Sequence, residues 1–386
     1  MELKAGYKQT ELGVIPEDWA VVQLQEVANV VDSLHQTPSF AEDGYPMVRV
    51  SDIKTGNLNF DVALKVSESI FVEFTKNYKP KRGDIVLSRV GSYGISSFVE
   101  TDEPFCMGQN TVVLQSKLPA RFLYYVLNSR GTRQQIEDGS YGSGYKSLSL
   151  KNIKDLRIPV PPRDTEQHAI ATTLSDVDAL IGALDRLIAK KRDLKQATMQ
   201  QLLTGQTRLP GFSGEWEVKP LGDVATFCAG TYLAQGNYRD GEYEVQGAGS
   251  VMGNHDVPNF PRAISVIGRV GTVGRPRFMP VGCWVNNNAA AIIAREPFGI
   301  PKFVHLLLLT VDWSKVTSVT AQPFLVVPAL LGMESLVPEH DEQTVIAAVL
   351  SDMDAEIVAL EARRDKTRAL KQGMMQELLT GKTRLI

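Results

Sequence analysis

Two stretches of the chain place an apolar residue at alternating steps of four and three positions. They lie in residues 165–209 and 341–385, where only Gly182 and Gly373 interrupt otherwise helix-forming sequence before each Leu-Leu-Thr-Gly end. This spacing is typical of a coiled-coil seam, so each stretch predicts one long helix. The seam positions are Ile170, Leu174, Val177, Ile181, Leu184 and Ile188, then Ile346, Leu350, Met353, Ile357 and Leu360. After charged breaks, the seam is expected to resume at Leu194, Leu202, Leu370, Met374 and Leu378.

The two stretches are copies of one another. They align without a gap at an offset of 176, with about 26 of 45 positions identical. Internal repetition of this kind dictates architecture. A helix buried along the flank of one domain is the alternative, but two near-identical copies favour a mutual helix pair.

The direction of the pair follows from the chain order. At about 1.5 Å per residue, the first helix is roughly 58 Å long. The second helix begins where the second half of the chain finishes folding, near the C-terminal end of the first. We therefore expect it to run back antiparallel, with two globular segments separated by the rod.

These globular segments are head one (residues 1–164) and head two (residues 210–340), and the helical stretches complete the expected domains at 165–209 and 341–386. Both heads begin alike, because Trp19 matches Trp216 and Leu24 matches Leu221, with Val27 and Val224 also equivalent. Trp at such positions is more often a core anchor than a binding residue. The expected fold class is α+β: two α/β heads separated by two long antiparallel helices, with a pseudo-twofold internal repeat.

Short β-rich runs separated by Gly- and Pro-containing turns fill both heads, as in a compact β-rich module. In head one, strands are expected at 45–50, 84–89, 95–99 and 111–115, helices at 121–137 and 149–155, and a strand before Pro159. In head two, strands are expected at 243–246, 263–268 and 289–294, with a helix at 301–309.

Charge and cysteine content narrow the possible binding partners and the cellular compartment. The formal net charge is −3, and no segment is strongly basic, so nucleic-acid contact would have to rest on local patches. The three cysteines lie far apart without metal-ligand spacing, which suits a reducing cytosol. No apolar run is long enough to span a bilayer, and we expect a cytoplasmic protein.

Two loops correspond between the heads, Arg89–Gly94 and Arg269–Gly274, each following a predicted strand. Glycine permits close backbone approach, and Arg beside Ser or Thr is a common set for base edges and phosphates. The alternatives are a hairpin in a β core with a solvated Arg and, for the loop 139–147, a flexible surface loop. The candidate DNA-binding residues are Lys79, Lys81, Arg82, Arg89, Ser92, Tyr93, Tyr141, Tyr145, Lys146, Arg269, Thr272, Arg275 and Arg277.

Catalytic signatures are missing from the sequence. Gly381-Lys-Thr lies at a helix C-terminus, where the dipole opposes phosphate, and its copy reads Gly205-Gln-Thr. The five histidines show no metal spacing, and there is no amino-methyltransferase Pro-Pro motif. The pairs Asp176/Asp178 and Asp352/Asp354 point apart on a helix and are expected to form a solvated or partner-facing surface. We expect no catalytic residue and no metal site.

The whole chain resembles the specificity subunit of type I restriction-modification enzymes. The resemblance rests on Glu166-Gln167 after Pro-Pro, on Glu342-Gln343, on the doubled Leu-Leu-Thr-Gly, and on Gly83-Asp84-Ile-Val-Leu-Ser-Arg. It departs at Pro338-Glu-His340, where a second Pro-Pro would stand. The resemblance implies a non-catalytic subunit that reads a bipartite asymmetric DNA site through two target recognition domains.

It further implies docking of two methyltransferase subunits and of restriction/translocase subunits, which would bring S-adenosylmethionine, ATP and magnesium. Two rival functions stay open at this point: a self-contained methyltransferase or nuclease, and a coiled-coil scaffold that does not bind DNA.

Overall fold

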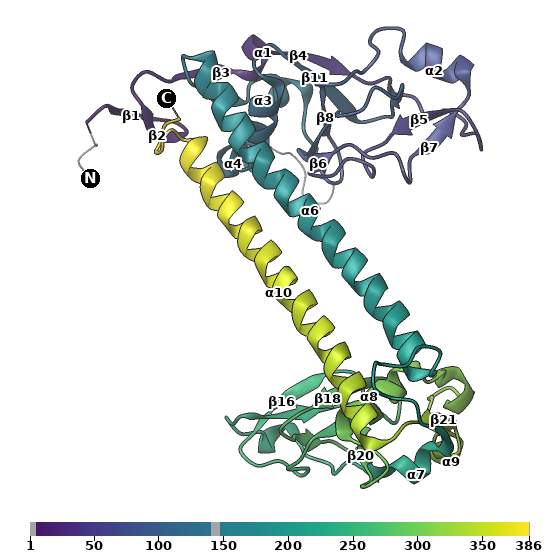
Figure 1. Cartoon of the computed structure of the whole chain (residues 1–386). Coiled ribbons are helices and arrows are strands. Elements are labelled where there is room, and N and C mark those ends of the chain that lie inside the picture. Colours follow the sequence, from purple (N-terminus) through teal and green to yellow (C-terminus); the bar gives the residue numbers. More distant parts are fainter. Residues whose placement is uncertain (1–4, 140–146, 386) are drawn as a thin grey trace. The chain divides into compact units, whose positions relative to one another are not determined.

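The computed structural model describes residues 5–139 and 147–385, and the chain divides into two compact units. Unit one comprises residues 1–185 and 362–386, and unit two comprises residues 186–361. Each unit therefore contains one head together with one half of each long helix (Figure 1).

Head one is built on a five-stranded sheet with a three-stranded sheet beside it. The five-stranded order is β4 (Ala28–Asp32), β11 (Thr111–Ser116), β8 (Ile85–Ser88), β9 (Ser96–Phe98) and β6 (Gly56–Asn57). The three-stranded order is β10 (Cys106–Met107), β5 (Tyr45–Val48) and β7 (Leu64–Val66). Two-stranded sheets pair β1 (Tyr7–Thr10) with β2 (Gly13–Pro16) and β12 (Arg157–Val160) with β3 (Ala20–Gln23). The helices are α1 (Leu24–Val27), α2 (Glu68–Phe74), α3 (Ala120–Leu127), α4 (Arg130–Asp138) and α5 (Leu150–Lys154).

Head two repeats this topology strand for strand, apart from β6 and the β1–β2 hairpin. Its main sheet has the order β14 (Ala225–Ala229), β20 (Ala289–Ala294), β17 (Ile264–Gly268) and β18 (Gly274–Met279). Its second sheet has the order β16 (Val251–His255), β15 (Tyr243–Gln246) and β19 (Trp284–Val285), and β13 (Glu217–Pro220) pairs with β21 (Glu334–Val337). The helices are α7 (Leu221–Val224), α8 (Pro301–Thr310) and α9 (Val327–Leu331), with 3-10 turns η1 (Gln235–Asn237) and η2 (Trp313–Val316).

The strands expected from the sequence are present, but the single helix expected at 121–137 is wrong. It is two helices, α3 and α4, separated at Asn128 and Ser129. The Ser129 hydroxyl accepts a hydrogen bond from the Thr132 amide and starts a new helix, a role in which serine stabilises a helix end better than a helix interior.

Helices α3 and α8 anchor to their sheets in the same way, which the sequence analysis missed. In head one, the Arg121 guanidinium lies 3.7 Å from the centroid of the Phe98 ring. In head two, the Lys302 ammonium lies 4.8 Å from the centroid of Phe278. Both phenylalanines belong to equivalent strands, β9 and β18, so a cation–π contact repeats along with the topology.

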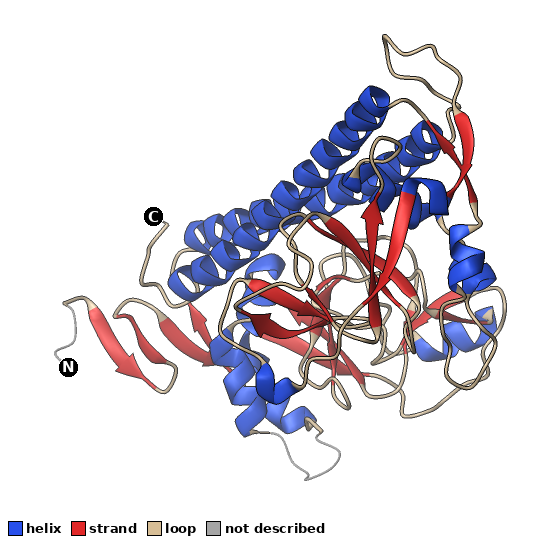
Figure 2. Ribbon diagram, turned by 90° about the horizontal axis from the view of Figure 1, so that it is seen from below, coloured by secondary structure: helices blue, strands red, loops and turns tan. Residues whose placement is uncertain are grey.

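The long helices are α6 (Asp164–Leu203) and α10 (His340–Leu378), and they run antiparallel side by side within each unit (Figures 1 and 2). In unit one, Lys371 Nζ lies 2.7 Å from Asp178, and Arg368 lies 2.9 Å from Asp185. The copies of these pairs, displaced by 176 residues, occur in unit two. They are Lys195 with Asp354 and Arg192 with Glu361.

Most seam positions pack inward, with Ile170, Leu174, Ile346 and Leu350 fully buried. Leu194 and Leu370 do not, because they are 50 % and 59 % exposed. The expectation that the seam resumes there is wrong, since the neighbouring residues Lys195 and Lys371 bridge the helices by ion pairs instead.

The paired aspartates form the expected solvated surface only in part. Asp178 and Asp354 accept these inter-helix ion pairs, whereas Asp176 and Asp352 are exposed. Half of each pair therefore helps to join the helices.

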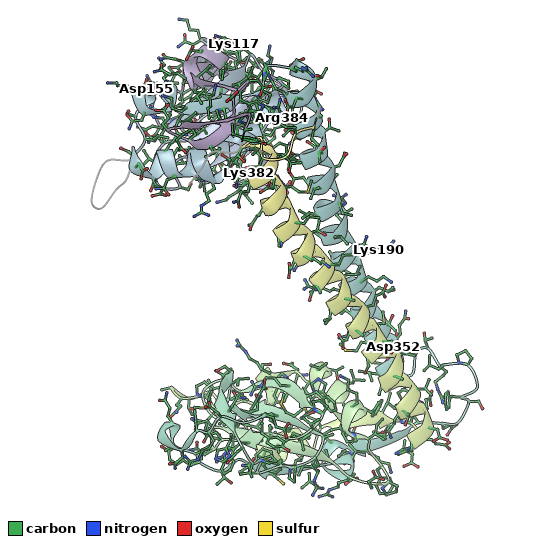
Figure 3. The ribbon with its side chains drawn as sticks, turned by 90° about the vertical axis from the view of Figure 1, so that its left-hand side faces the viewer. Lys117, Asp155, Lys190, Asp352, Lys382 and Arg384 are labelled. Carbon is green, nitrogen blue, oxygen red and sulfur yellow. The ribbon has the colours of Figure 1, made fainter. Side chains whose placement is uncertain are left out.

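An arginine clamp closes each unit where one long helix ends and the other begins. Arg384 holds the buried Glu166 at 2.6 and 2.8 Å and Asp18 at 2.9 Å, beyond the end of α10 (Figure 3). The hydrogen bond from Arg384 holds the pKa of Asp18 below its usual range. In unit two, Arg208 holds the buried Glu342 at 2.7 Å.

The buried glutamines next to these glutamates, Gln167 and Gln343, also repeat a contact. Each donates its side-chain amide to a proline carbonyl just before its helix, that of Pro161 or Pro338. The Glu-Gln pairs of the sequence are therefore structural, and the unusual Pro338-Glu-His340 does not disturb the start of α10.

None of the helices in the part of the chain that the structure describes is long and apolar enough to cross a membrane.

Candidate nucleic-acid interface

In each head, several loops meet at one end of the main sheet, and we call this surface the loop end. In head two it consists of the hairpin loop 269–274, the turn 286–288, the turn 247–250 and the segment 317–324. The hairpin loop follows β17 and the turn 286–288 precedes β20, so antiparallel pairing of these strands brings both to the same sheet end.

Backbone hydrogen bonds hold the head-two loop end together. The Arg269 amide donates to the Asn288 carbonyl at 2.9 Å, and the Leu325 amide donates to the Arg269 carbonyl at 2.8 Å. The Gly271 amide donates to the Pro323 carbonyl at 2.8 Å. Loops far apart in sequence thus form one surface on a rigid sheet.

The same bonds recur in head one. The Arg89 amide donates to the Asn110 carbonyl at 2.9 Å, and the Leu148 amide donates to the Arg89 carbonyl at 2.8 Å. The head-one loop end consists of the hairpin loop 89–94, the turn 108–110, the turn 49–52 and Ser147. The correspondence of the two hairpin loops predicted from the sequence is therefore confirmed.

In head one, carboxylates neutralise the arginines of the loop end. The half-buried Arg89 makes hydrogen bonds of 2.9 and 3.1 Å to the two oxygens of Asp32 and donates to the Leu148 carbonyl. Arg49 forms a bidentate pair with the buried Asp52. Both guanidinium groups therefore already have a carboxylate partner within the protein.

In head two, the equivalent surface keeps its positive charge. Arg269 donates to the Asn287 carbonyl at 3.1 Å, and no carboxylate within the described residues pairs with it. Arg277 donates to Gln246 and to the Gly247 carbonyl, so it anchors the turn 247–250. Burial lowers the pKa of Arg277.

The structure separates some of the predicted site residues. Lys79, Lys81 and Arg82 precede β8 and so lie at the opposite end of this strand from the hairpin loop. Lys79 lies 5.4 Å from the ring centroid of Phe71, and Arg82 pairs with Asp102.

The remaining predicted residues that can be placed lie at the loop ends. Ser92 donates to the Val50 carbonyl at 3.4 Å, and Tyr93 donates to Glu137 at 2.8 Å. Thr272 lies beside Gly249, and Arg275 is exposed with a φ of 51°. Tyr141, Tyr145 and Lys146 lie outside the described residues.

Each loop end also contains a turn rich in side-chain amides, which was not predicted from the sequence. It comprises Gln109 and Asn110 in head one and Asn286, Asn287 and Asn288 in head two. The signal was available, because three consecutive asparagines stand directly before a predicted strand.

The chemistry of both loop ends is that of hydrogen bonding. Amides, hydroxyls and arginines dominate, and side chains of these kinds form hydrogen bonds with base edges and donate to phosphates in protein–DNA complexes. No cluster of His, Cys, Asp and Glu that could hold a metal occurs in residues 5–139 or 147–385.

Comparison with known proteins agrees with this geometry. The family described as the type I restriction modification DNA specificity domain matches residues 16–190 and again 213–368. A putative type I restriction enzyme MjaX specificity subunit from Methanocaldococcus jannaschii is 24 % identical, covering 98 % of this chain and 97 % of that protein. The MjaVIII specificity subunit of the same organism is 26 % identical over 53 % of this chain and 49 % of its own length.

A solved structure shares the fold. The type I restriction-modification S subunit from M. genitalium superposes with a TM-score of 0.64, at 18 % identity, over 98 % of both chains. The family match covers both heads and most of both long helices, so the chain belongs to the family of type I restriction-modification DNA specificity subunits.

Proposed function

We propose that this chain reads a bipartite, asymmetric DNA site for a type I restriction-modification complex, with one head on each half of the site. The observation that carries this proposal is one scaffold built twice with two different loop ends. A repeated scaffold whose loops differ suits the recognition of two different DNA sequences, because loops tolerate substitutions that a packed core does not.

The chain supplies recognition, and the chemistry belongs to partners. We infer that two methyltransferase subunits dock on it and that restriction/translocase subunits join for cleavage. These subunits would hold S-adenosylmethionine, ATP and magnesium, and this chain would hold none of them.

Exposed apolar residues on the long helices support such docking. On α6, Leu180, Leu187 and Leu194 are spaced by seven residues, and each is more than a third exposed. A leucine every two turns is the pattern that a partner helix covers. The exposed Leu370 on α10 repeats Leu194 at the same offset of 176.

An exchange of head two tests the proposal. Residues 210–340 are replaced by the head of a relative that recognises another sequence, and the chain is assembled with its partner subunits. Selection of bound duplexes from a random library then reports the preferred site. We expect one half-site to change while the other half-site and the spacing stay the same. The reciprocal exchange of head one is the matched control and should change the opposite half. A complex without sequence preference, or one in which both halves change together, contradicts the proposal.

A further inference from the structure

The turn before the central strand of each main sheet presents side-chain amides at the loop end. In head two, Asn286 is buried, and its side chain accepts from the Leu233 and Asn287 amides and donates to the Leu233 carbonyl. Asn287 and Asn288 are exposed, and no described residue makes a hydrogen bond to either side chain. One asparagine therefore holds the turn and presents the next two outward.

The turn of head one has the same backbone role with different side chains. The carbonyls of Asn110 and Asn288 both accept from the arginine that opens the hairpin loop. Asparagine stands at this position in both heads, which suits its shared structural task. The preceding position differs, with Gln109 in head one and Asn287 in head two.

Gln109 is exposed, and no described residue accepts a hydrogen bond from its side-chain amide. Its side-chain oxygen accepts from the Thr37 hydroxyl at 3.3 Å and retains a second lone pair. It therefore offers an outward donor and acceptor from the equivalent point of its head. Glutamine is one methylene longer than asparagine. The two heads therefore present the same carboxamide group at different distances from the backbone.

We infer that Asn287 and Gln109 are specificity-determining residues, each of which reads an adenine in the half-site of its own head. This inference rests on the proposed DNA-reading function. A carboxamide is the side chain that pairs bidentately with adenine in the major groove, donating to N7 and accepting from the N6 amino group. The sheet beneath the turn supplies the rigidity that such a contact needs.

The flanking groups favour this assignment. The Arg269 guanidinium lies against the same turn through its bond to the Asn287 carbonyl, and no acidic residue occurs in 269–274 or 286–288. A surface with amides and with a cation that has no carboxylate partner among the described residues accepts the edge of a base beside a phosphate. Carboxylates would repel the phosphate.

The test compares Asn287→Ala and Asn287→Asp with the unaltered chain, each assembled with its partner subunits. Binding is measured on duplexes that carry every single-base change in the site. The unaltered complex should prefer adenine at one position of the head-two half-site by roughly 5- to 150-fold. Asn287→Ala should lose that preference and keep all others. Asn287→Asp has the same shape but cannot donate to N7, and should shift the preference toward cytosine, whose N4 amino group donates.

Modified DNA adds an independent readout. Replacing that adenine by 7-deazaadenine removes the N7 acceptor, which should weaken binding of the unaltered complex and leave Asn287→Ala unaffected. Gln109→Ala should give the same result in the other half-site. Asn237→Ala changes an exposed asparagine outside the loop end and serves as the control, with an unchanged profile.

The outcomes distinguish a failure of the proposed function from a failure of this inference alone. If the unaltered complex shows no sequence preference, the proposed function fails and this inference falls with it. If it discriminates normally and Asn287→Ala keeps the adenine preference, only this inference is overturned. An equal loss on all duplexes with a shallower salt dependence would identify a phosphate contact and would also overturn it. Equal thermal unfolding of the Ala, Asp and unaltered chains confirms that folding is not what changed.

Discussion

The two heads share one scaffold and differ in how their loop ends handle charge. Their main sheets have the same strand order, and equivalent cations lie over equivalent phenylalanines, Phe98 and Phe278. At the loop end, Asp32 binds Arg89 in head one, whereas Arg269 of head two has only a carbonyl partner among the described residues. The buried frame is thus repeated while the exposed loops are not.

From this difference we expect the two heads to contribute unequally to DNA binding. An uncompensated guanidinium attracts phosphate over a Debye length, about 8 Å at physiological salt. A guanidinium already paired with a carboxylate does not, because its field is cancelled locally. We therefore expect head two to contribute more electrostatic attraction, and head one to rely more on neutral hydrogen-bonding groups and shape.

The largest expected effect concerns the clamps. Glu166 is buried and accepts from Arg384, its partner among the described residues, while Glu342 accepts from Arg208 and also from the Trp216 indole at 2.9 Å. Arg384→Ala leaves a buried carboxylate unpaired and should cost about 3–5 kcal/mol in the stability of unit one. Arg208→Ala should cost unit two less, because the indole still donates to Glu342.

Hydrogen exchange resolved by peptide reports the free energy of opening for each unit separately. Arg186→Ala, an exposed arginine on α6, is the matched control and should change neither unit by more than about 0.5 kcal/mol. Equal losses in the two units would show that the clamps are energetically equivalent in spite of the extra indole bond.

Much of the fold could be predicted because its signals are periodic. The seam and its copy predicted both long helices, and their antiparallel direction followed from chain order alone. The break between α3 and α4 could not be predicted, since it depends on the side chain of Ser129 competing with a continuous helix. The exposure of Leu194 depends on ion pairs from the other helix, which periodicity does not reveal.

A smaller expected effect is a pH dependence of stability that differs between the two heads. His305 of α8 is buried, and its ring nitrogen lies 3.1 Å from the Ser265 hydroxyl. Burial lowers the pKa of His305 to about 4, against roughly 6.5 in an unfolded chain. Between these values the unfolded state binds more protons, so stability is lost as pH falls from about 6.5 to about 4. The loss should approach roughly 3 kcal/mol for unit two.

The equivalent aromatic residue of head one does not titrate in this range. Tyr124 packs on Phe98 as His305 packs on Phe278, and burial raises the pKa of Tyr124 to about 12. Urea unfolding at several pH values, followed by hydrogen exchange in each unit, measures the difference. His305→Gln should flatten the acid slope of unit two and leave unit one unchanged. A slope that persists in this variant would assign it to carboxylates instead.

The candidate site was less predictable than the fold. The two hairpin loops could be paired from sequence because each Arg-Val-Gly follows a strand. The sequence did not reveal that Lys81 and Arg82 lie at the other end of β8, since proximity in sequence hides the length of a strand. Nor did it reveal that Asp32, 57 residues away, neutralises Arg89. Such pairings are set by tertiary structure.

The smallest expected effect tests the comparison of the loop ends directly, with Arg89→Ala and Arg269→Ala as a matched pair. Arg269→Ala should weaken binding of the specific duplex by about 1–3 kcal/mol, with little change in stability, because the side chain has no ion pair among the described residues to lose. Arg89→Ala should do the reverse. It removes the guanidinium that pairs with the half-buried Asp32, which keeps the Ser33 amide and the His35 ring as hydrogen-bonding partners. The variant should therefore destabilise unit one by about 1–3 kcal/mol, while binding by the folded fraction changes less. Fluorescence anisotropy with labelled duplex at two salt concentrations measures binding, and hydrogen exchange measures stability. A contact of Arg269 with phosphate would appear as a uniform loss on all sequences and a salt slope reduced by about one.

If Arg89→Ala instead impairs binding and leaves unit one equally stable, the Asp32 pair is broken in the complex and both heads use their arginines alike.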